Sequence, residues 1–408
     1  MLSDEILEKV IDRVVRRIEL GNTYVLTQIG KTINKMGTLT PTRAYQLEQI
    51  FKYGGDYDKI VKELAKMTNL NVADIYKIFD EVAKNDYQFA KKFYDYRNKA
   101  FIPYKDNLTL QNEVKAIARQ TALSYVNMSN TFAFKTFENG RYVNTPLATL
   151  YQDVIDKAVL SVSQGKMTFD DEMYQTIKEL SASGLKTIDY DSGRSIRLDS
   201  AVKMNLKQGL RELHNKIQEV TGEEFGADGV EISVHLNPAI DHEEVQGRQF
   251  SNEEYAKLND GLNAVDYKGN SYTLDHDGKN GWRPISTLNC YHYIFAIILG
   301  VSEPSYSDKE LKEIRDKNDK GFELHGKHYT MYQGEQLLRN VELELRKAKD
   351  QQIMGRASNN IQAIDDAQMR ITILTDKYRY ILNASGLPSK LDRARVSGYH
   401  RVNTKKLK

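Results

Sequence analysis

The residues best suited to metal binding or nucleophilic chemistry gather in one stretch of the chain, residues 235–306. This stretch holds four of the eight histidines, the only cysteine and the only tryptophan. Imidazole nitrogens and a thiolate sulfur are the ligands that zinc prefers in proteins. The sequence therefore offers one candidate metal site, and its possible ligands are His235, His242, Cys290 and His292.

The spacing of these four residues only weakly supports a metal site. Six residues separate His235 from His242, one residue separates Cys290 from His292, and neither spacing is that of a standard zinc motif. Side chains two positions apart on a strand point the same way, so Cys290 and His292 can bind one ion together. In the favoured alternative, the imidazoles bond backbone carbonyls and the cysteine packs as a small apolar side chain. We therefore predict no metal or other cofactor and keep the four residues as candidate ligands.

Two enzyme hypotheses use the same stretch. A metal-dependent hydrolase or nuclease would hold a catalytic ion with His235, His242, Cys290 and His292. A Cys–His nucleophile would need an oxyanion-binding loop, and the sequence around Cys290 has no glycine-rich segment of that kind. Phosphate-binding loops of the GxxxxGK[ST] type are also missing from the sequence. We therefore predict that the protein is not an enzyme, with the metal-dependent hydrolase or nuclease as the alternative.

Composition narrows the class of protein. A chain of 408 residues suggests two or three domains, and its 40% hydrophobic content excludes wholesale disorder. Only 7 prolines and a 28% charged content, mostly in Lys/Glu-rich periodic runs, predict a mainly helical protein. The single cysteine excludes an intrachain disulfide and fits a reducing compartment. The longest apolar run, residues 293–301, is too short to span a bilayer, so we expect no membrane partner.

The pattern of apolar residues predicts an α+β, mainly α fold in three regions. Residues 1–145 form an N-terminal helical region, which we expect to be a bundle of short helices joined by tight turns. Residues 146–306 form a mixed α+β core with a small sheet, because residues 230–236 alternate between apolar and polar side chains. Residues 307–408 form a helical hairpin and a basic tail.

The C-terminal hairpin is predicted from apolar residues that repeat at intervals of three and four between residues 364 and 381. The preceding segment, residues 332–350, offers a matching apolar face, and residues 357–360 read as the turn between the two helices. The seam is too short for a free coiled coil, so we expect an intrachain pair.

The basic tail, residues 390–408, carries seven Lys or Arg residues and one acidic residue. It can bind nucleic acid through phosphate contacts, or it is a frayed, solvated end of the chain. The candidate DNA contacts are Lys390, Arg393, Arg395, Arg401, Lys405, Lys406 and Lys408.

Several phrases of the sequence resemble one known protein family. The central ones are RSIRLDSAVKMNLKQGLRELHNKI, VEISVHLNPAIDHEEVQGRQF and NGWRPISTLNCYHYIFAIILGVSEPSYS. The resemblance extends to GTLTPTRAYQLEQIFKYGGD and to HYTMYQGEQLLRNVELELRKAK, so that it covers most of the chain. The family is phage minor capsid protein 2, which is related to the Mu F-like head-morphogenesis proteins of tailed phages.

Two signatures of that family carry the resemblance at residue level. Its H-x(6)-H-x(3)-Q-G phrase matches His235, His242, Gln246 and Gly247, and its N-C-x-H element matches Asn289, Cys290 and His292. The chain differs from the family at Val245, where an aromatic residue is usual, and at Tyr291, where an arginine is usual. The resemblance implies that the seven matching residues are fold determinants rather than catalytic groups.

The resemblance also implies a function. It predicts a structural minor capsid protein of a tailed phage, present in the virion in few copies. Such a protein associates with the portal protein inside the head and assists head assembly, DNA packaging or DNA ejection. Its expected partners are the portal, other capsid proteins and DNA. Its expected locations are the capsid interior and, during assembly, the cytoplasm of the bacterial host.

Overall fold

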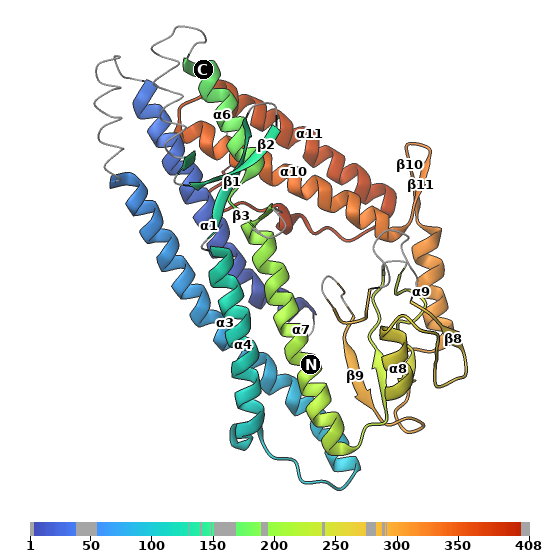
Figure 1. Ribbon diagram of the computed structural model, residues 1–408. Coiled ribbons are helices and arrows are strands. Elements are labelled where there is room, and N and C mark those ends of the chain that lie inside the picture. The colour runs from blue at the N-terminus through green and yellow to red at the C-terminus, as the bar shows by residue number, and fades with distance from the viewer. Residues whose placement is uncertain are drawn as a thin grey trace. The chain divides into compact units, whose positions relative to one another are not determined.

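The computed structural model describes residues 4–37, 55–129, 131–138, 141–147, 149–150, 169–188, 195–238, 241–274, 283–287, 290 and 292–400. Helices dominate these residues, and the strands form small antiparallel sheets (Figure 1). The predicted α+β, mainly α fold is therefore confirmed.

Most of the helical residues belong to a few long helices. These are α1 (Asp4–Gly37), α3 (Gly55–Tyr96), α4 (Leu108–Ser129), α6 (Phe169–Ser183), α7 (Leu198–Phe225), α10 (Met331–Ala357) and α11 (Ile361–Ser385). The shorter ones are α8 (Asn252–Asn259), α9 (Asp308–Lys320) and the 3-10 helices η1 (Tyr104–Asp106) and η2 (Leu391–Ala394).

The strands are short and form four separate sheets among the described residues. The first sheet has the order β2-β1-β3-β4, with β1 (Phe132–Glu138), β2 (Arg141–Pro146), β3 (Lys186–Ile188) and β4 (Ser195–Arg197). The second has the order β6-β5-β9, with β5 (Gly229–Ile232), β6 (Gln249–Ser251) and β9 (Ile294–Ile297). Two hairpins complete the set: β7 (Ala264–Val265) with β8 (Ser271–Tyr272), and β10 (Phe322–Leu324) with β11 (Lys327–Tyr329).

Tertiary contacts divide the chain into two compact units that are interleaved in sequence. Unit 1 comprises Met1–Ile11, Ile75–Ala122 and Met204–Gln336. Unit 2 comprises Asp12–Asp74, Leu123–Lys203 and Leu337–Lys408. The sequence predicts three consecutive regions, 1–145, 146–306 and 307–408, whereas each of the two units is built from three separate segments. The division into three regions stays a prediction.

The N-terminal helices are longer than predicted. The sequence predicts a new short helix from Asn71, but α3 continues without interruption from Gly55 to Tyr96. Asn71 does not cap a new helix, because its buried side chain is bonded within unit 2. Its Nδ2 donates to the Tyr125 hydroxyl at 2.9 Å, and its Oδ1 accepts from the Arg17 guanidinium at 3.0 Å. Tertiary bonds therefore override a local signal for a helix start.

Two glycines of α1 let helices of unit 2 approach closely. A methyl group added at Gly21 would lie 2.8 Å from the sulfur of Met67 in α3. One added at Gly30 would lie 2.7 Å from the Cβ of Ala357 in α10. The neighbours of Gly30 are a Cβ atom and a backbone carbonyl, so this contact requires glycine, whereas the flexible end of Met67 can move away from a methyl group at Gly21.

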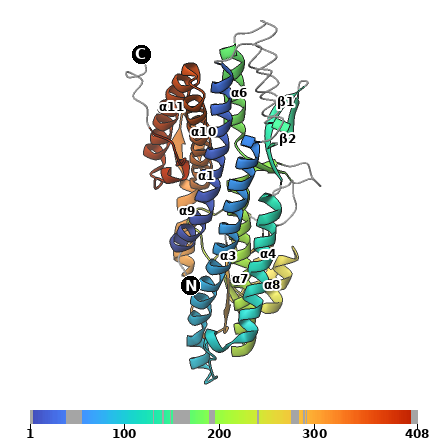
Figure 2. The same cartoon turned by 90° about the vertical axis from the view of Figure 1, so that its left-hand side faces the viewer.

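The predicted C-terminal hairpin is confirmed in unit 2. Helices α10 and α11 lie side by side in both views (Figures 1 and 2). Asn360 begins α11, since its side chain accepts from the Ala363 amide, and Gly386 ends the helix with φ of 65°. Of the predicted seam, Leu374 is half-buried and the other members are buried. The buried seam residues of the two helices are Leu338, Val341, Leu345, Ala348, Ile364, Ala367, Ile371, Tyr378 and Ile381.

The Asn-Gly pair at residues 139–140 predicts a β-hairpin, and strands β1 and β2 of unit 2 pair on either side of it. Glu138 pairs with Arg141, which leaves a two-residue connection at the predicted place. The two turn residues lie outside the described residues, as does most of the helix expected from Pro146 to Ser163. The hairpin itself is confirmed.

The sheet β6-β5-β9 forms the centre of unit 1. One cluster of buried residues packs around β5 and β6, and it includes Val245 and Ile285 from the flanking loops. A second cluster joins Ala296 and Ile298 of the β9 segment to Phe225 at the end of α7. Val245, where the family usually has an aromatic residue, is therefore a core side chain here.

The strand predicted over residues 230–236 is too long. Strand β5 ends at Ile232, and Leu236 is 72% exposed. Past Ile232, side chains take over part of the strand pairing. The Tyr293 amide donates to Ser233 Oγ, and the His235 amide donates to Gln246 Oε1, both at 2.8 Å. Beyond Ile232, the backbone pairing of the strands is therefore partly replaced by side-chain hydrogen bonds that belong to the candidate site.

Candidate metal centre

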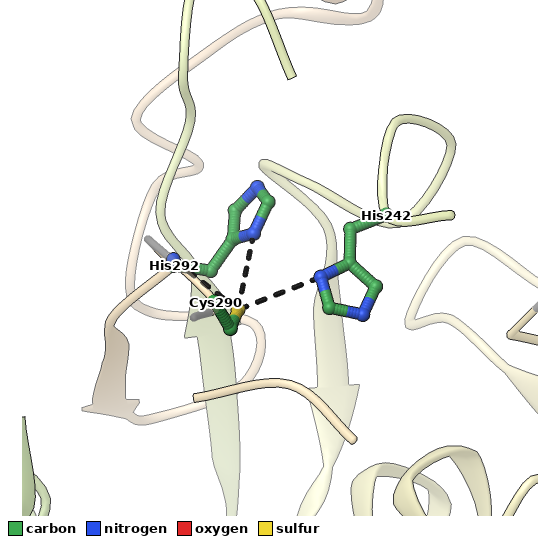
Figure 3. A group of neighbouring side chains, drawn as sticks. All are labelled: His242, Cys290 and His292. Carbon is green, nitrogen blue, oxygen red and sulfur yellow. Dashed lines mark hydrogen bonds between the residues drawn. The ribbon is translucent and has the colours of Figure 1, made fainter. Parts of the chain in front are cut away.

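Three of the four candidate ligands meet in unit 1. The sulfur of Cys290 lies 3.5 Å from Nδ1 of His242 and 3.5 Å from Nδ1 of His292. Figure 3 shows both rings directed at the sulfur, with His242 coming from a different segment than the other two residues. All three ligand atoms lie within 4.8 Å of one another. The fold thus brings His242 next to Cys290, which lies 48 positions further along the sequence.

His242 is oriented by a backbone carbonyl. Its Nε2 lies 2.7 Å from the carbonyl oxygen of Arg283, so Nε2–H donates and Nδ1 is left with its lone pair toward Cys290. Asp241 fixes the same loop, because its carboxylate accepts from the Arg283 guanidinium at 2.9 Å and 2.7 Å. The sequence could not show the contact between His242 and Arg283, because the group that orients His242 is a backbone carbonyl.

Gln246 orients the second histidine. Its Oε1 lies 3.4 Å from Nε2 of His292 and accepts from the amide of His235 at 2.8 Å. The ring of His235 lies next to that of His292, with 4.7 Å between their centroids, but it is not part of the three-residue group. The signature residues His235, Gln246 and His292 thus form one connected arrangement.

Gly247 has a conformational role in this loop. Its φ is +70°, a region that favours glycine, and its amide donates to the Ile232 carbonyl at 2.8 Å. An added methyl group would lie 2.6 Å from the side chain of Leu311 and 2.9 Å from that of Val234. The positive φ would strain any other residue here, and an added methyl group would also crowd Leu311 and Val234.

Cys290 receives two backbone hydrogen bonds at its sulfur. The amide of Ser286 donates at 3.3 Å and that of His292 at 3.4 Å. Ser286 has a φ of +63°, which is unusual for a residue other than glycine. Its hydroxyl is held by Asn215 of α7, with bonds of 2.9 Å and 3.1 Å. A strained turn is therefore fixed so that its amide points at the thiol. Asn289, the first residue of this signature, lies outside the described residues.

The electrostatics of the cluster lower the pKa of the Cys290 thiol. Burial opposes ionisation of Cys290, but the hydrogen bond and charge of His242 hold the pKa of the thiol below its ordinary value. Burial also disfavours the charged form of His242, yet the contact with Cys290 raises the pKa of this histidine overall. Burial and the neighbouring His235 and His242 lower the pKa of His292 to about 2, so its ring is neutral. A thiolate and a neutral imidazole are the forms that bind a metal ion, so the shifts of Cys290 and His292 favour metal binding and that of His242 opposes it.

The sequence does not single out one histidine that positions the site. His214 of α7 is buried, with Nδ1 2.8 Å from the Asp86 carboxylate and Nε2 2.8 Å from the Ile294 carbonyl. It thereby attaches β9, just beyond His292, to helices of unit 1. The available signal was its position four residues after Leu210, on the apolar side of the helix.

Part of the basic tail can also be placed. The segment up to Ser397 is packed within unit 2: Lys349 donates to the Ala394 carbonyl at 2.5 Å and Thr23 to the Ser397 carbonyl at 2.9 Å. Of the candidate DNA contacts, Arg395 is exposed, whereas Lys390 and Arg393 are half-buried. This part of the tail is therefore not frayed. The remaining candidates, Arg401, Lys405, Lys406 and Lys408, lie outside the described residues.

The fold and the cluster define a mainly helical protein with a small α+β core organised around buried Cys and His side chains. The model of the family Phage minor capsid protein 2 matches residues 2–383, and the chain belongs to this family. Its role is that of a structural protein of the bacteriophage capsid. Searches of curated proteins and of solved structures found no match. Among the described residues, no helix has both the length and the apolar character needed to cross a membrane.

Proposed function

We propose that the protein is a low-copy head protein of a tailed phage that binds the portal from inside the capsid. There it assists head assembly, DNA packaging or DNA ejection. The observation that carries this proposal is the family match over residues 2–383, which covers both units rather than one shared module. During assembly the protein is in the cytoplasm of the bacterial host, and afterwards it is in the virion.

An exposed apolar stripe on α11 supports a protein partner. Met369, Ile373 and Tyr380 are 61%, 59% and 50% exposed. Their spacings of four and seven residues place them along one side of the helix, opposite the seam that packs on α10. Large apolar side chains gathered on one face often mark a protein contact. We assign this face to the portal or to another capsid protein.

The basic C-terminal segment supports a second partner, the packaged DNA. Arg395 is exposed, and the sequence continues with Arg401, Lys405, Lys406 and Lys408. Phosphate contacts of this kind release counterions, so the affinity for DNA should fall steeply with salt. DNA is therefore proposed as a non-specific partner rather than a substrate.

The burial of the Cys–His cluster favours a structural role over a hydrolase or nuclease. Cys290, His242 and His292 are 1%, 1% and 4% exposed, so a substrate would have no direct access to them. The proposed function therefore assigns these residues to the fold of unit 1.

The test is to look for the protein in purified virions and to measure its binding to the portal. Quantitative mass spectrometry of mature particles should find it in a few copies relative to the major capsid protein. The purified protein should also bind assembled portal in a sedimentation assay. Its absence from virions together with a lack of portal binding would reject the proposal.

A further inference from the structure

We propose that Cys290, His242 and His292 bind a structural zinc ion through the cysteine sulfur and the two Nδ1 atoms. The ion joins the loop at residues 241–247 to the segment that leads into β9. This inference concerns the stability of unit 1 and does not rest on the proposed capsid function. A single-cysteine chain makes it unusually easy to test.

The two sulfur–nitrogen distances fit a tetrahedral zinc centre, and the two Nδ1 atoms lie within 4.8 Å of each other. Zinc–sulfur and zinc–nitrogen bonds of about 2.3 Å and 2.05 Å, at a tetrahedral angle, separate the two ligand atoms by about 3.6 Å. The two sulfur–nitrogen distances here are both 3.5 Å. A thiol–imidazole hydrogen bond also accounts for one such distance, but one S–H proton cannot serve both rings at once, and the N–H of each neutral ring is directed at an oxygen rather than at the sulfur. A shared cation accounts for the two equal distances together.

Hydrogen bonds outside the cluster set each ring in the form that a metal requires. A metal-binding histidine usually donates its other N–H to a carbonyl or carboxylate oxygen. His242 has the Arg283 carbonyl at Nε2, and His292 has the Gln246 side-chain oxygen at Nε2. Both Nδ1 atoms therefore present lone pairs to the position beside the sulfur.

The sulfur has the surroundings of a zinc-bound thiolate. Backbone amides of Ser286 and His292 donate to it, and such N–H···S bonds stabilise negative charge on sulfur. The turn that supplies one of them keeps a positive φ at Ser286, which is retained only where the surroundings enforce it. Three protein ligands leave a fourth position, which can be taken by a water molecule or by His235, whose ring lies beside His292.

Burial makes this a closed, structural site. The three side chains are almost inaccessible to solvent. Catalytic zinc sites keep an open position for substrate, whereas structural sites are enclosed and contribute directly to folding stability. The expected consequence of zinc loss is a weaker connection between residues 241–247 and residues 290–292, close to the sheet β6-β5-β9.

The experiment uses the full-length protein, purified without a histidine tag and without chelators. Elemental analysis should find about one zinc per chain. Replacement of zinc by cobalt should produce a thiolate-to-cobalt charge-transfer band, and Cys290 is the only residue that can produce one. Cys290→Ser should abolish this band, and His242→Gln should weaken cobalt binding by at least tenfold. His328→Gln, at an exposed histidine of unit 1, should change neither measurement.

A second measurement on the unaltered chain covers the case that the variants fail to fold. A strong chelator should raise the rate at which a thiol reagent modifies Cys290 and should lower the melting temperature, and added zinc should reverse both effects. Protein that contains no zinc, gives no charge-transfer band with cobalt and is unaffected by the chelator would overturn the proposal. Persistence of the band in folded Cys290→Ser would overturn the ligand assignment.

Discussion

Asp350 of α10 and Arg197 of β4 form a buried ion pair in unit 2, with 3.2 Å between Oδ2 and Nη2. The Asp350 side chain has no exposed surface, and Asn22 of α1 donates to its other oxygen at 3.3 Å. Burial raises the pKa of Asp350, and the charges of Arg197 and Arg346 act in the opposite direction. The pair joins a strand, a helix and the N-terminal helix at one point in the core.

Replacing Asp350 by alanine should lower the free energy of unfolding by about 3–5 kcal/mol, because Arg197 would remain buried without its closest carboxylate. Urea denaturation followed by circular dichroism measures this loss. Asp376→Ala is the matched control, since Asp376 pairs with Arg379 at 3.4 Å on the surface of α11. The control should cost less than about 0.5 kcal/mol. Equal losses in the two variants would contradict a special role for the buried pair.

The sequence predicted the C-terminal hairpin well and this ion pair not at all. The hairpin depends on apolar residues that recur every three or four positions, a local pattern that one helix imposes on its own sequence. Asp350 lies among many charged residues of a helical run, and its partner is 153 positions away. Nothing local distinguishes a charged residue that will be buried from one that will face solvent. Only the packing of the helices decides it.

The candidate site was predicted in part for a similar reason. Residue types and the family signature selected His242, Cys290 and His292, and the structure brings all three together. His235 was grouped with them by its spacing, but it lies beside His292 rather than within the cluster. The orientation of the rings depends on the Arg283 carbonyl and on a serine with positive φ, and backbone atoms leave no signature in a sequence.

Gly30→Ala tests the close contact between α1 and α10 in unit 2. In an isolated helix alanine is favoured over glycine by about 1 kcal/mol. Here the added methyl group would meet Ala357 Cβ at 2.7 Å and the Met354 carbonyl at 2.9 Å. We expect a net destabilisation of about 1–3 kcal/mol, as for other overpacked cores.

Differential scanning calorimetry of Gly30→Ala should show a lower melting temperature. The second change Ala357→Gly removes the nearer of the two clashing atoms. Gly30→Ala should therefore lower the melting temperature less in the Ala357→Gly protein than in the unaltered protein. Helix propensity alone predicts that Gly30→Ala stabilises the protein. That result would show that α1 and α10 do not approach each other this closely.

Two neighbouring glutamates of α10 should respond to pH in opposite ways. Glu342 is buried, and burial raises its pKa above the ordinary 4.5, although the Tyr378 hydroxyl donates to it at 3.0 Å. The folded state therefore holds this proton more tightly than the unfolded state. The favourable contribution of Glu342 is present below the ordinary pKa and is lost as pH rises through the folded-state pKa. The stability of Glu342→Gln, measured relative to the unaltered protein at the same pH, should therefore be higher at pH 7 than at pH 4.

Glu344 provides the matched comparison. Partial burial works against its ionisation, but Lys347 and Arg370 pair with it and lower its pKa overall. Its contribution is present above the ordinary pKa and is lost as pH falls through the folded-state pKa. Glu344→Gln should cost about 0.5 kcal/mol at neutral pH and less in acid. Unfolding midpoints measured between about pH 4 and 7 should therefore diverge for the two variants; parallel curves would refute the assignment.

The exposed stripe of α11 leads to a prediction about portal binding. In the double variant Met369→Glu, Ile373→Glu, two charges replace side chains that are 61% and 59% exposed. The free energy of unfolding should change by less than about 0.5 kcal/mol per site, because neither side chain is in the core. If this face contacts the portal, affinity should fall by at least tenfold, about 1.4 kcal/mol, since the charges would have to be buried in the interface.

Sedimentation of labelled protein with assembled portal measures that affinity. Leu236→Glu is the control, because Leu236 is an apolar residue outside α11 that is 72% exposed. It should bind portal as the unaltered protein does. Normal binding by the double variant would remove α11 from the contact while leaving membership of the family untouched. Equal weakening by both variants would indicate a general effect of added negative charge rather than a specific face.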